Sequence, residues 1–277
     1  MRALAASRGI RPKKSLGQHF LIEPALARRI VELAEVGPTS RVLEIGAGLG
    51  SLTVELARTG ARVVAMELDA RLAEALRDVV GEQPRVDVLV ADALTVDWSE
   101  VLSGGPWVVV ANLPYNVGVP VIMRILDREP RVKRMLVMVQ KELGDRLAAR
   151  PGESPYGALS VRVAYRAEAR VIRPVSRSVF WPPPNVDSVL VSLTRRPPPV
   201  DVVEADLWRT IEVAFEQRRK TIRGALLRLG LDAVAAADTL AACGIDRRER
   251  PERLSLGEFA CLAGRWPRAL DPTASDG

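Results

Sequence analysis

The sequence predicts an α/β domain with a mostly parallel, seven-stranded sheet, followed by a small all-α domain. Three observations support this prediction. From residue 41 onward, short β-rich runs alternate with helical stretches, which is the pattern of parallel strands joined by right-handed helical crossovers. A glycine-rich turn separates the first of these strands from its helix. Beyond residue 195 only helical patterns remain.

The strands are predicted from short runs of apolar and β-branched residues, which are typical of buried strands. These runs lie at 41–45, 62–67, 86–91, 107–111, 134–139, 159–165 and 188–194. Helices are expected between them at 51–58, 70–80, 119–127 and 141–149. In the C-terminal part the expected helices cover 206–229, 231–242 and 256–266.

Changes in this pattern divide the chain into three expected parts. Residues 1–40 form an N-terminal basic segment and a helix that precede the sheet. The α/β domain is expected over 41–195 and the helical domain over 196–277. The run Arg-Arg-Pro-Pro-Pro-Val at 195–200 is typical of a linker, because consecutive prolines lack the N–H groups that a strand or helix needs.

The composition is basic, with a net charge of +6 and a pI near 9.8, which favours a polyanionic partner. Only five of the 40 basic residues are lysine, however, and with many alanines this bias is also typical of a GC-rich genome. Composition alone therefore leaves nucleic-acid binding open, and the placement of the charges has to decide.

Several other classes of protein are excluded. No apolar run approaches the ~20 residues of a membrane helix, so no membrane association is expected. His19 is the single histidine, which argues against Ser-His-Asp hydrolysis and histidine-based zinc sites. Cys243 and Cys261 form no CxxC pattern, so we expect neither a disulfide scaffold nor a metal site. Both cysteines are expected to be small buried residues.

The N-terminus carries positive charge without acidic residues. It lacks the apolar core of a signal peptide, and a patterned segment at 14–21 follows at once and leaves little to cleave. A cytoplasmic location is therefore expected. The basic residues among the first 14 are Arg2, Arg8, Arg11, Lys13 and Lys14.

A glycine-rich fingerprint, Glu-Ile-Gly-Ala-Gly-Leu-Gly at 44–50, ends the first strand and opens a helix. Glycine tolerates positive φ and lets the backbone approach a ligand closely. No Gly-Lys-Ser/Thr follows, so the turn is not a Walker A loop. Gly46 and Gly48 are therefore candidates for binding a dinucleotide-like or nucleoside cofactor, although such a turn can also be purely structural.

Two acidic residues follow the next two strands. Glu67 ends the second strand, where a carboxylate can accept both ribose hydroxyls of an adenosine cofactor. Asp92 follows the third strand, where it could accept a hydrogen bond from the adenine amino group. Ligands of open α/β sheets bind outside the carboxyl ends of the strands, so both acids are expected beside the glycine turn. Asp69 is better explained as a helix N-cap.

The fourth strand ends in Asn112-Leu113-Pro114-Tyr115. The amino group of adenine is a poor nucleophile, because its lone pair is delocalised into the ring. The side-chain oxygen of Asn112 and a nearby carbonyl, such as that of Leu113, could each accept one of its N–H groups and direct the lone pair at a methyl donor. Pro114 fixes the turn, and Tyr115 could stack on the base. Positioning then supplies most of the acceleration.

These motifs together resemble the KsgA (RsmA)/Dim-type small-subunit rRNA adenine dimethyltransferases. The resemblance covers about residues 13–265. The Erm enzymes, which methylate large-subunit rRNA, share the proline-rich segment at 181–188. The C-terminal Gln-Arg-Arg-Lys-Thr-Ile-Arg segment favours the KsgA/Dim-type family over the Erm enzymes. The resemblance is carried by the segments at 18–21, 44–50, 92–93, 112–115, 180–188 and 215–223, and by Glu67.

The resemblance implies a Rossmann-like class I methyltransferase with S-adenosylmethionine as cofactor. Its substrate would be two adjacent adenosines near the 3′ end of 16S rRNA within the immature 30S subunit. Phe180 would be a second aromatic wall that holds the target base against Tyr115. His19 stands where the family often has asparagine. The implied cofactor contacts are His19, Leu21, Gly46, Gly48, Glu67, Asp92 and Asn112.

Three basic stretches are candidates for contacting RNA: the N-terminus, residues 162–177 and the helix at 209–228. On that helix, like charges four residues apart repel one another unless a polyanion is bound. Each stretch could instead be an ordinary solvated surface. The residues expected to bind RNA are Lys13, Lys14, Arg218, Arg219, Lys220 and Arg223.

Two other functions stay open. The chain could be an Erm-type 23S rRNA adenine N6-methyltransferase. It could also be a factor in ribosome assembly or transcription that binds RNA on the same fold without catalysis. The intact motifs at 44–50 and 112–115 argue against a dead site. Nothing in the sequence indicates an obligate oligomer or a metal, so a monomer without metal is expected.

Overall fold

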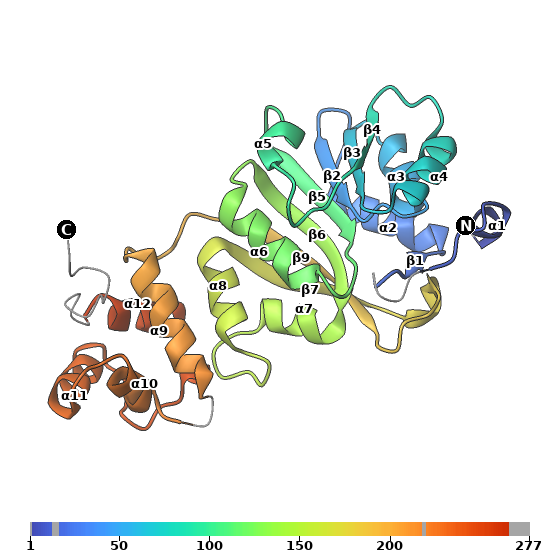
Figure 1. Ribbon diagram of the computed structural model, residues 1–277. Coiled ribbons are helices and arrows are strands. Elements are labelled where there is room, and N and C mark those ends of the chain that lie inside the picture. The colour runs from blue at the N-terminus through green and yellow to red at the C-terminus, as the bar shows by residue number, and fades with distance from the viewer. Residues whose placement is uncertain (1, 13–16, 218–219, 266–277) are drawn as a thin grey trace. The chain divides into compact units, whose positions relative to one another are not determined.

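The computed structural model describes residues 2–12, 17–217 and 220–265 (Figure 1). The chain forms two compact units. An α/β unit contains the chain up to Asp145 together with Ala167–Arg195. A helical unit contains Arg146–Arg166 and the chain from Arg196 onward. It thus includes residues 146–166, which the sequence pattern predicts to be part of the α/β domain.

The α/β unit is built on a seven-stranded sheet with the order β4-β3-β2-β5-β6-β9-β7, which confirms the expected fold class (Figure 1). The first five strands in this order pair in parallel, and β9 and β7 pair antiparallel. In chain order the strands are β2 (Arg41–Ile45), β3 (Arg62–Glu67), β4 (Val86–Val90), β5 (Trp107–Asn112), β6 (Val132–Gln140), β7 (Ala167–Val175) and β9 (Ser188–Arg195).

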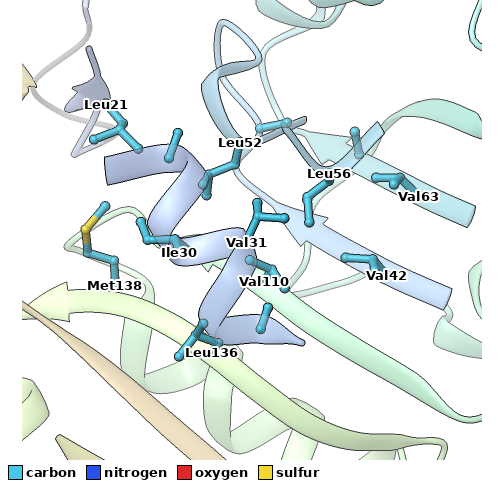
Figure 2. Packing of buried hydrophobic residues seen from close by; sticks show 14 of the residues in the cluster. Leu21, Ile30, Val31, Val42, Leu52, Leu56, Val63, Val110, Leu136 and Met138 are labelled. Atoms are coloured by element: carbon cyan, nitrogen blue, oxygen red, sulfur yellow. The ribbon is translucent and has the colours of Figure 1, made fainter. Parts of the chain in front are cut away.

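Both faces of the sheet are covered. Successive strand residues point to opposite faces, and the neighbours Val42 and Leu43 are both fully buried. Figure 2 shows one face, where Ile30 of α2 and Leu56 of α3 pack in a cluster with strand residues such as Val110. The helices of this part of the chain are α1 (Arg2–Ser7), α2 (Pro24–Ala34), α3 (Ser51–Arg58), α4 (Ala70–Val80), α5 (Trp98–Val101), α6 (Gly118–Arg128) and α7 (Lys141–Ala148).

A short antiparallel ribbon joins two segments that lie far apart in the sequence. It consists of β1 (Phe20–Leu21) and β8 (Phe180–Trp181), with Leu21 opposite Phe180. A 3₁₀ turn (Arg177–Val179) precedes β8. No pattern in the sequence predicts this ribbon, because strands of two residues carry no periodic signal. It holds the N-terminal segment against the start of the proline-rich segment.

The prediction of a strand at 159–165 is wrong. These residues belong to helix α8 (Ala158–Arg166), and the seventh strand of the sheet is β7 instead. The alternating apolar residues of this run also place Val161 and Tyr165 four residues apart, so both pack in the core of the helical unit. The sequence does not predict β7, because this strand lies at the edge of the sheet and is mostly exposed, so it lacks the apolar run of a buried strand.

The helical unit has its own core, in which Ile211, Leu226 and Phe259 are fully buried. The single helix expected at 206–229 is interrupted, and the structure has two helices there. Besides α8, the helices are α9 (Glu204–Glu216), α10 (Ile222–Arg228), α11 (Ala233–Ala242) and α12 (Leu256–Ala263), with a 3₁₀ turn (Pro251–Arg253) before the last. Within the described ranges, no helix is both long and apolar enough to span a bilayer.

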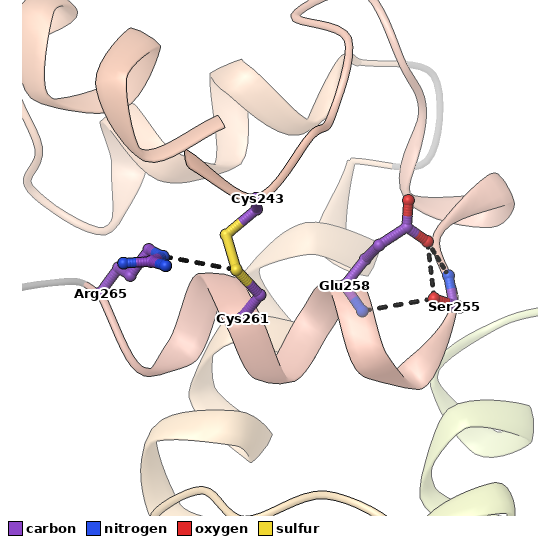
Figure 3. Close-up of a disulfide and its surroundings, with 5 residues drawn as sticks. All are labelled: Cys243, Ser255, Glu258, Cys261 and Arg265. Carbon is purple, nitrogen blue, oxygen red and sulfur yellow. Dashed lines mark hydrogen bonds between the residues drawn. A yellow bond between two sulfur atoms is a disulfide. The ribbon is translucent and has the colours of Figure 1, made fainter. Parts of the chain in front are cut away.

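A disulfide joins Cys243 and Cys261, with an S–S distance of 2.11 Å (Figure 3). The expectation of two buried cysteines without a disulfide is therefore wrong: both residues are only half-buried. Cys243 caps the end of α11 and Cys261 lies on α12, so folding brings their Cα atoms to 5.8 Å. The start of α12 is fixed by a capping box between Ser255 and Glu258 (Figure 3).

We expect reduction of this disulfide to lower the stability of the helical unit. A cross-link across 18 residues stabilises a fold by ~3 kcal/mol, mainly by restricting the unfolded chain. Thermal unfolding with and without a reductant measures the effect, and mass spectrometry after alkylation counts the free thiols. The double variant Cys243→Ser/Cys261→Ser is the control, because its unfolding should not respond to the reductant. Full alkylation of the unreduced protein would contradict the prediction.

Candidate active site

A cavity opens at the carboxyl edge of the parallel strands. Its walls come from the glycine turn after β2 and from the ends of β3, β4 and β5, and the segment at 17–21 contributes a further side. The strands reach this edge together because Ile45 lies opposite Met66, and Met66 opposite Leu89. The residues that follow these strands therefore lie close together around the cavity.

The glycine turn is shaped by two close approaches. Gly46 and Gly48 have φ values of +73° and +56°, which L side chains rarely adopt. A Cβ atom on Gly48 would lie 3.0 Å from the ring of Phe20, and one on Gly46 would lie 3.2 Å from Pro114. Both glycines also line the cavity, so the main chain of this turn is within reach of a ligand.

Glu67 ends β3 and holds the turn in place. Its carboxylate accepts hydrogen bonds from the N–H of Gly48 at 2.8 Å and from the N–H of Asp69 at 2.9 Å. Burial raises the pKa of the Glu67 carboxyl, whereas these N–H groups act in the opposite direction. Each oxygen of a carboxylate can accept a second hydrogen bond, so Glu67 retains capacity for the hydroxyl groups of a ligand.

Asp92 also borders the cavity, and its carboxylate accepts a hydrogen bond from the N–H of Leu94 at 2.8 Å. Asp69 accepts one from the N–H of Arg71 as the N-cap of α4, which confirms its expected structural role. The described residues hold no group of three or more His, Cys, Asp or Glu side chains that could bind a metal ion.

Glu44 also belongs to this site, although the sequence patterns predict no role for it. It is 2% exposed, lines the cavity and accepts a hydrogen bond from the hydroxyl of Thr53 at 2.6 Å. Burial raises the pKa of the Glu44 carboxyl to about 8, and the nearby Glu67 adds to this effect. Burial therefore favours the protonated form of Glu44 near neutral pH. The sequence signal for this residue is that Glu44 is the first residue of the glycine-rich fingerprint at 44–50.

Asn112 ends β5 at the inner side of the cavity. Its side-chain nitrogen donates a hydrogen bond to the backbone carbonyl of His19 at 2.9 Å, which fixes the orientation of the amide. Its side-chain oxygen is buried and has no hydrogen-bond partner among the described residues. A buried acceptor without a partner costs free energy, so this oxygen is suited to a donor that a ligand supplies.

Tyr115 is half-buried, and two neighbours hold its ring. Its hydroxyl lies 2.5 Å from the hydroxyl of Ser188, and its ring centroid lies 5.0 Å from that of His19. The Nδ1–H of His19 in turn donates to the carbonyl of Pro182 at 2.7 Å. Burial raises the pKa of the Tyr115 phenol. Leu21, Leu113 and Pro114 also line the cavity.

Phe180 does not lie in the cavity, although it was expected to form a second aromatic wall. Its side chain is 1% exposed and packs in the same core cluster as Leu21 and Ile30. The pairing of β1 with β8 places Phe180 opposite Leu21 and directs it into the core. In this structure Phe180 therefore cannot stack on a base in the cavity.

The residues expected to bind RNA are only partly described. Lys13, Lys14, Arg218 and Arg219 lie outside the described residues, whereas Lys220 is exposed and Arg223 half-buried at the start of α10.

The basic stretch at 162–177 is divided between the two units. Arg162 lies over the ring of Trp208, and Arg166 pairs with Glu204, both inside the helical unit. The remaining arginines of the stretch belong to the α/β unit and are exposed on β7 and the 3₁₀ turn after it: Arg170, Arg173 and Arg177.

The raised pKa of Glu44 predicts a pH-dependent stability that the variant Glu44→Gln should lack. Between pH 4.5 and about 8 the unfolded chain has lost the Glu44 proton while the folded chain keeps it. The contribution of Glu44 to the free energy of unfolding is fully present below pH 4.5. It is lost as the pH rises through the pKa of about 8 that Glu44 has in the folded protein. The loss amounts to up to about 1.4 kcal/mol per pH unit.

Urea unfolding of both proteins across this pH interval measures the difference. Glutamine keeps an oxygen that can accept the Thr53 hydroxyl, so the comparison isolates the charge. Parallel pH profiles for the two proteins would contradict the prediction.

Known proteins resemble this chain along nearly its whole length. The family described as ribosomal RNA adenine dimethylase matches residues 9–263. A relative from Thermobifida fusca, named ribosomal RNA small subunit methyltransferase A, is 46% identical and covers 96% of this chain and 94% of its own. A relative of the same name from Moorella thermoacetica is 42% identical and covers 94% of both chains.

Solved structures agree with this relationship. The 23S rRNA methyltransferase ErmE superposes with a TM-score of 0.70 at 27% identity and covers 89% of this chain and 98% of its own. A dimethyladenosine transferase from Plasmodium falciparum superposes with a TM-score of 0.73 at 25% identity and covers 88% and 96%. The fold is thus that of the class I methyltransferases, and the chain belongs to the ribosomal RNA adenine dimethylase family.

Proposed function

We propose that this protein uses S-adenosylmethionine to dimethylate N6 of two adjacent adenosines near the 3′ end of 16S rRNA in the immature 30S subunit. The observation that carries the proposal is the buried oxygen of Asn112, which lacks a partner in a cavity bordered by the glycine turn and by Tyr115. The names of the relatives favour the small subunit as the source of the substrate.

The residues of the cavity fit S-adenosylmethionine. The main chain at Gly46 and Gly48 can approach the cofactor, Glu67 can accept hydrogen bonds from its ribose, and Asp92 can accept one from its adenine amino group. His19 and Leu21 border the same cavity from the N-terminal segment. When bound, the cofactor supplies an electrophilic methyl group on a sulfonium.

The chain's contribution to the reaction is then the orientation of the target amine. The oxygen of Asn112 and the carbonyl of Leu113 accept its two N–H groups, so that the nitrogen lone pair points away from both. Tyr115 stacks on the base and fixes its plane, an interaction worth roughly 1–3 kcal/mol. No histidine base is required, because the nitrogen becomes positively charged as it gains the methyl group and then releases a proton to water.

A second transfer can use the same groups. After the first methylation the amine keeps one N–H and a lone pair, so one acceptor is still engaged while the lone pair faces the donor. Binding of a flipped-out adenosine in this way requires the base to leave its stack, which is common to enzymes that modify bases. The basic residues of α10 and of the preceding segment would hold the surrounding RNA.

An Erm-type activity is the alternative, since ErmE shares the fold and is named for 23S rRNA. Purified protein and methyl-labelled cofactor would be offered immature small subunits and protein-free 23S rRNA side by side. Dimethyladenosine in the small subunit alone, located by nucleoside mass spectrometry, is the expected result. Label in 23S rRNA would favour the Erm activity, and tight binding without label would favour a non-catalytic assembly factor.

Asn112→Ala should lower methyl transfer by at least about 100-fold, because it removes the acceptor that orients the amine. Binding of the small subunit should be unchanged, because the RNA contacts are expected elsewhere. Initial rates and filter-binding affinities measured on the same preparation separate the two effects. Undiminished turnover by the variant would disprove this account of the reacting centre.

Lys220→Ala/Arg223→Ala should weaken RNA binding and reduce the slope of log Kd against log salt by about one to two, because two phosphate contacts are lost. The charge-matched control is Arg128→Ala/Lys133→Ala, which removes two exposed positive charges from α6 and β6 of the α/β unit. Equal salt slopes for the two double variants would instead show that Lys220 and Arg223 belong to an ordinary solvated surface.

A further inference from the structure

We propose that Ser188 is a positioning residue for methyl transfer and that the proline-rich segment at 181–188 acts through it as a clamp on Tyr115. The proposal rests on the proposed function, in which Tyr115 stacks on the target base. It gives the segment a role other than the aromatic wall expected from Phe180.

Tyr115 needs an external restraint. It lies in the turn between β5 and α6, outside any helix or strand, so the local backbone alone does not fix the direction of its ring. The hydroxyl groups of Tyr115 and Ser188 form a hydrogen bond of 2.5 Å. Ser188 is 0% exposed, so no water competes for its hydroxyl. The hydroxyl end of the Tyr115 side chain is therefore hydrogen-bonded to one buried atom, the hydroxyl oxygen of Ser188.

Ser188 is itself held rigidly. It is the first residue of β9, which lies between β6 and β7, and it pairs with Gln140 on one side and with Val175 on the other. The neighbouring carbonyl of Asp187 also accepts a hydrogen bond from the N–H of Lys141 at 2.9 Å. Because strands on both sides fix its backbone, Ser188 gives the Tyr115 hydroxyl a fixed anchor.

The same segment reaches Tyr115 by a second route. The carbonyl of Pro182 accepts the Nδ1–H of His19 at 2.7 Å, and the His19 ring lies 5.0 Å from the Tyr115 ring at an angle of 34°. The start of the segment is fixed in turn by Phe180, which is buried in the core. Tyr115 is thus restrained at its hydroxyl by one end of the segment and at its ring through the other.

Loss of the Ser188 hydroxyl should therefore act on turnover rather than on binding. Without the hydrogen bond the Tyr115 ring loses one of its two restraints, and the stacked base is held less often with its amine aimed at the methyl group. The glycine turn, Glu67 and Asp92 do not contact Ser188 in any described hydrogen bond, so cofactor affinity should be unaffected. RNA contacts on α10 should be unaffected for the same reason.

A double-mutant cycle tests the proposal, with Ser188→Ala, Tyr115→Phe and the combined variant assayed on immature small subunits. Each single variant breaks the same hydrogen bond and should lower kcat by about tenfold, and the combination should be no worse than either alone. Isothermal titration calorimetry with S-adenosylmethionine should give the wild-type Kd for all three. Ser160→Ala is the matched control, since it removes a buried serine hydroxyl that donates to the Arg146 carbonyl in the helical unit.

The possible results separate this proposal from the proposed function. Additive losses in the cycle, or wild-type kcat for Ser188→Ala, would overturn the role of Ser188 as an anchor of Tyr115. A loss equal to that of Ser160→Ala would overturn it as well. If Ser188→Ala does not fold, Tyr115→Phe removes the other hydroxyl of the same hydrogen bond and must alone reproduce the loss in kcat. Full activity of Tyr115→Ala would instead overturn the stacking role on which the proposed function depends.

Discussion

The common register of β4, β3, β2 and β5 is the constraint on which the rest of the site depends. Parallel strands end at the same edge, so the groups that follow them meet there without any long-range contact between their side chains. The carbonyl of Met66 at the end of β3 accepts hydrogen bonds from the N–H groups of Gly46 and Ala47, and Glu67 accepts one from Gly48. The glycine turn is therefore fixed by its neighbouring strand, and its shape is set before any ligand arrives.

The N-terminal segment closes the site through its backbone as much as through its side chains. The carbonyl of His19 accepts the hydrogen bond that orients the Asn112 amide, a contact that any residue at this position could make. The imidazole of His19 serves a different purpose, because it donates to Pro182 and lies beside Tyr115. A histidine where the family often has asparagine therefore leaves the orientation of Asn112 intact, and its effect should be sought at Tyr115.

The parallel sheet and the edge where its motifs meet follow from the sequence, because strand periodicity and turn residues are local properties. What depends on pairing between distant segments does not follow. Phe180 is buried because a two-residue strand pairs with Leu21, and no pattern announces such a short strand. The run at 159–165 alternates like a strand and folds as a helix, because the helical unit offers it a core. The disulfide likewise requires α11 and α12 to meet before it can form.

In the proposed function, the division of the chain into two units separates the chemistry from the choice of RNA. All residues that line the cavity belong to the α/β unit, and an adenine amine presents the same two N–H groups in any ribosomal RNA. In the proposed function, Asn112 and Tyr115 would therefore not distinguish a small-subunit adenosine from a large-subunit one. ErmE shares the fold and is named for 23S rRNA, which agrees with this reasoning. In the proposed function, selection of the substrate would then come from surfaces outside the cavity. Lys220 and Arg223 are the described residues that we propose for it, because phosphate contacts fix the register of a protein on its nucleic acid.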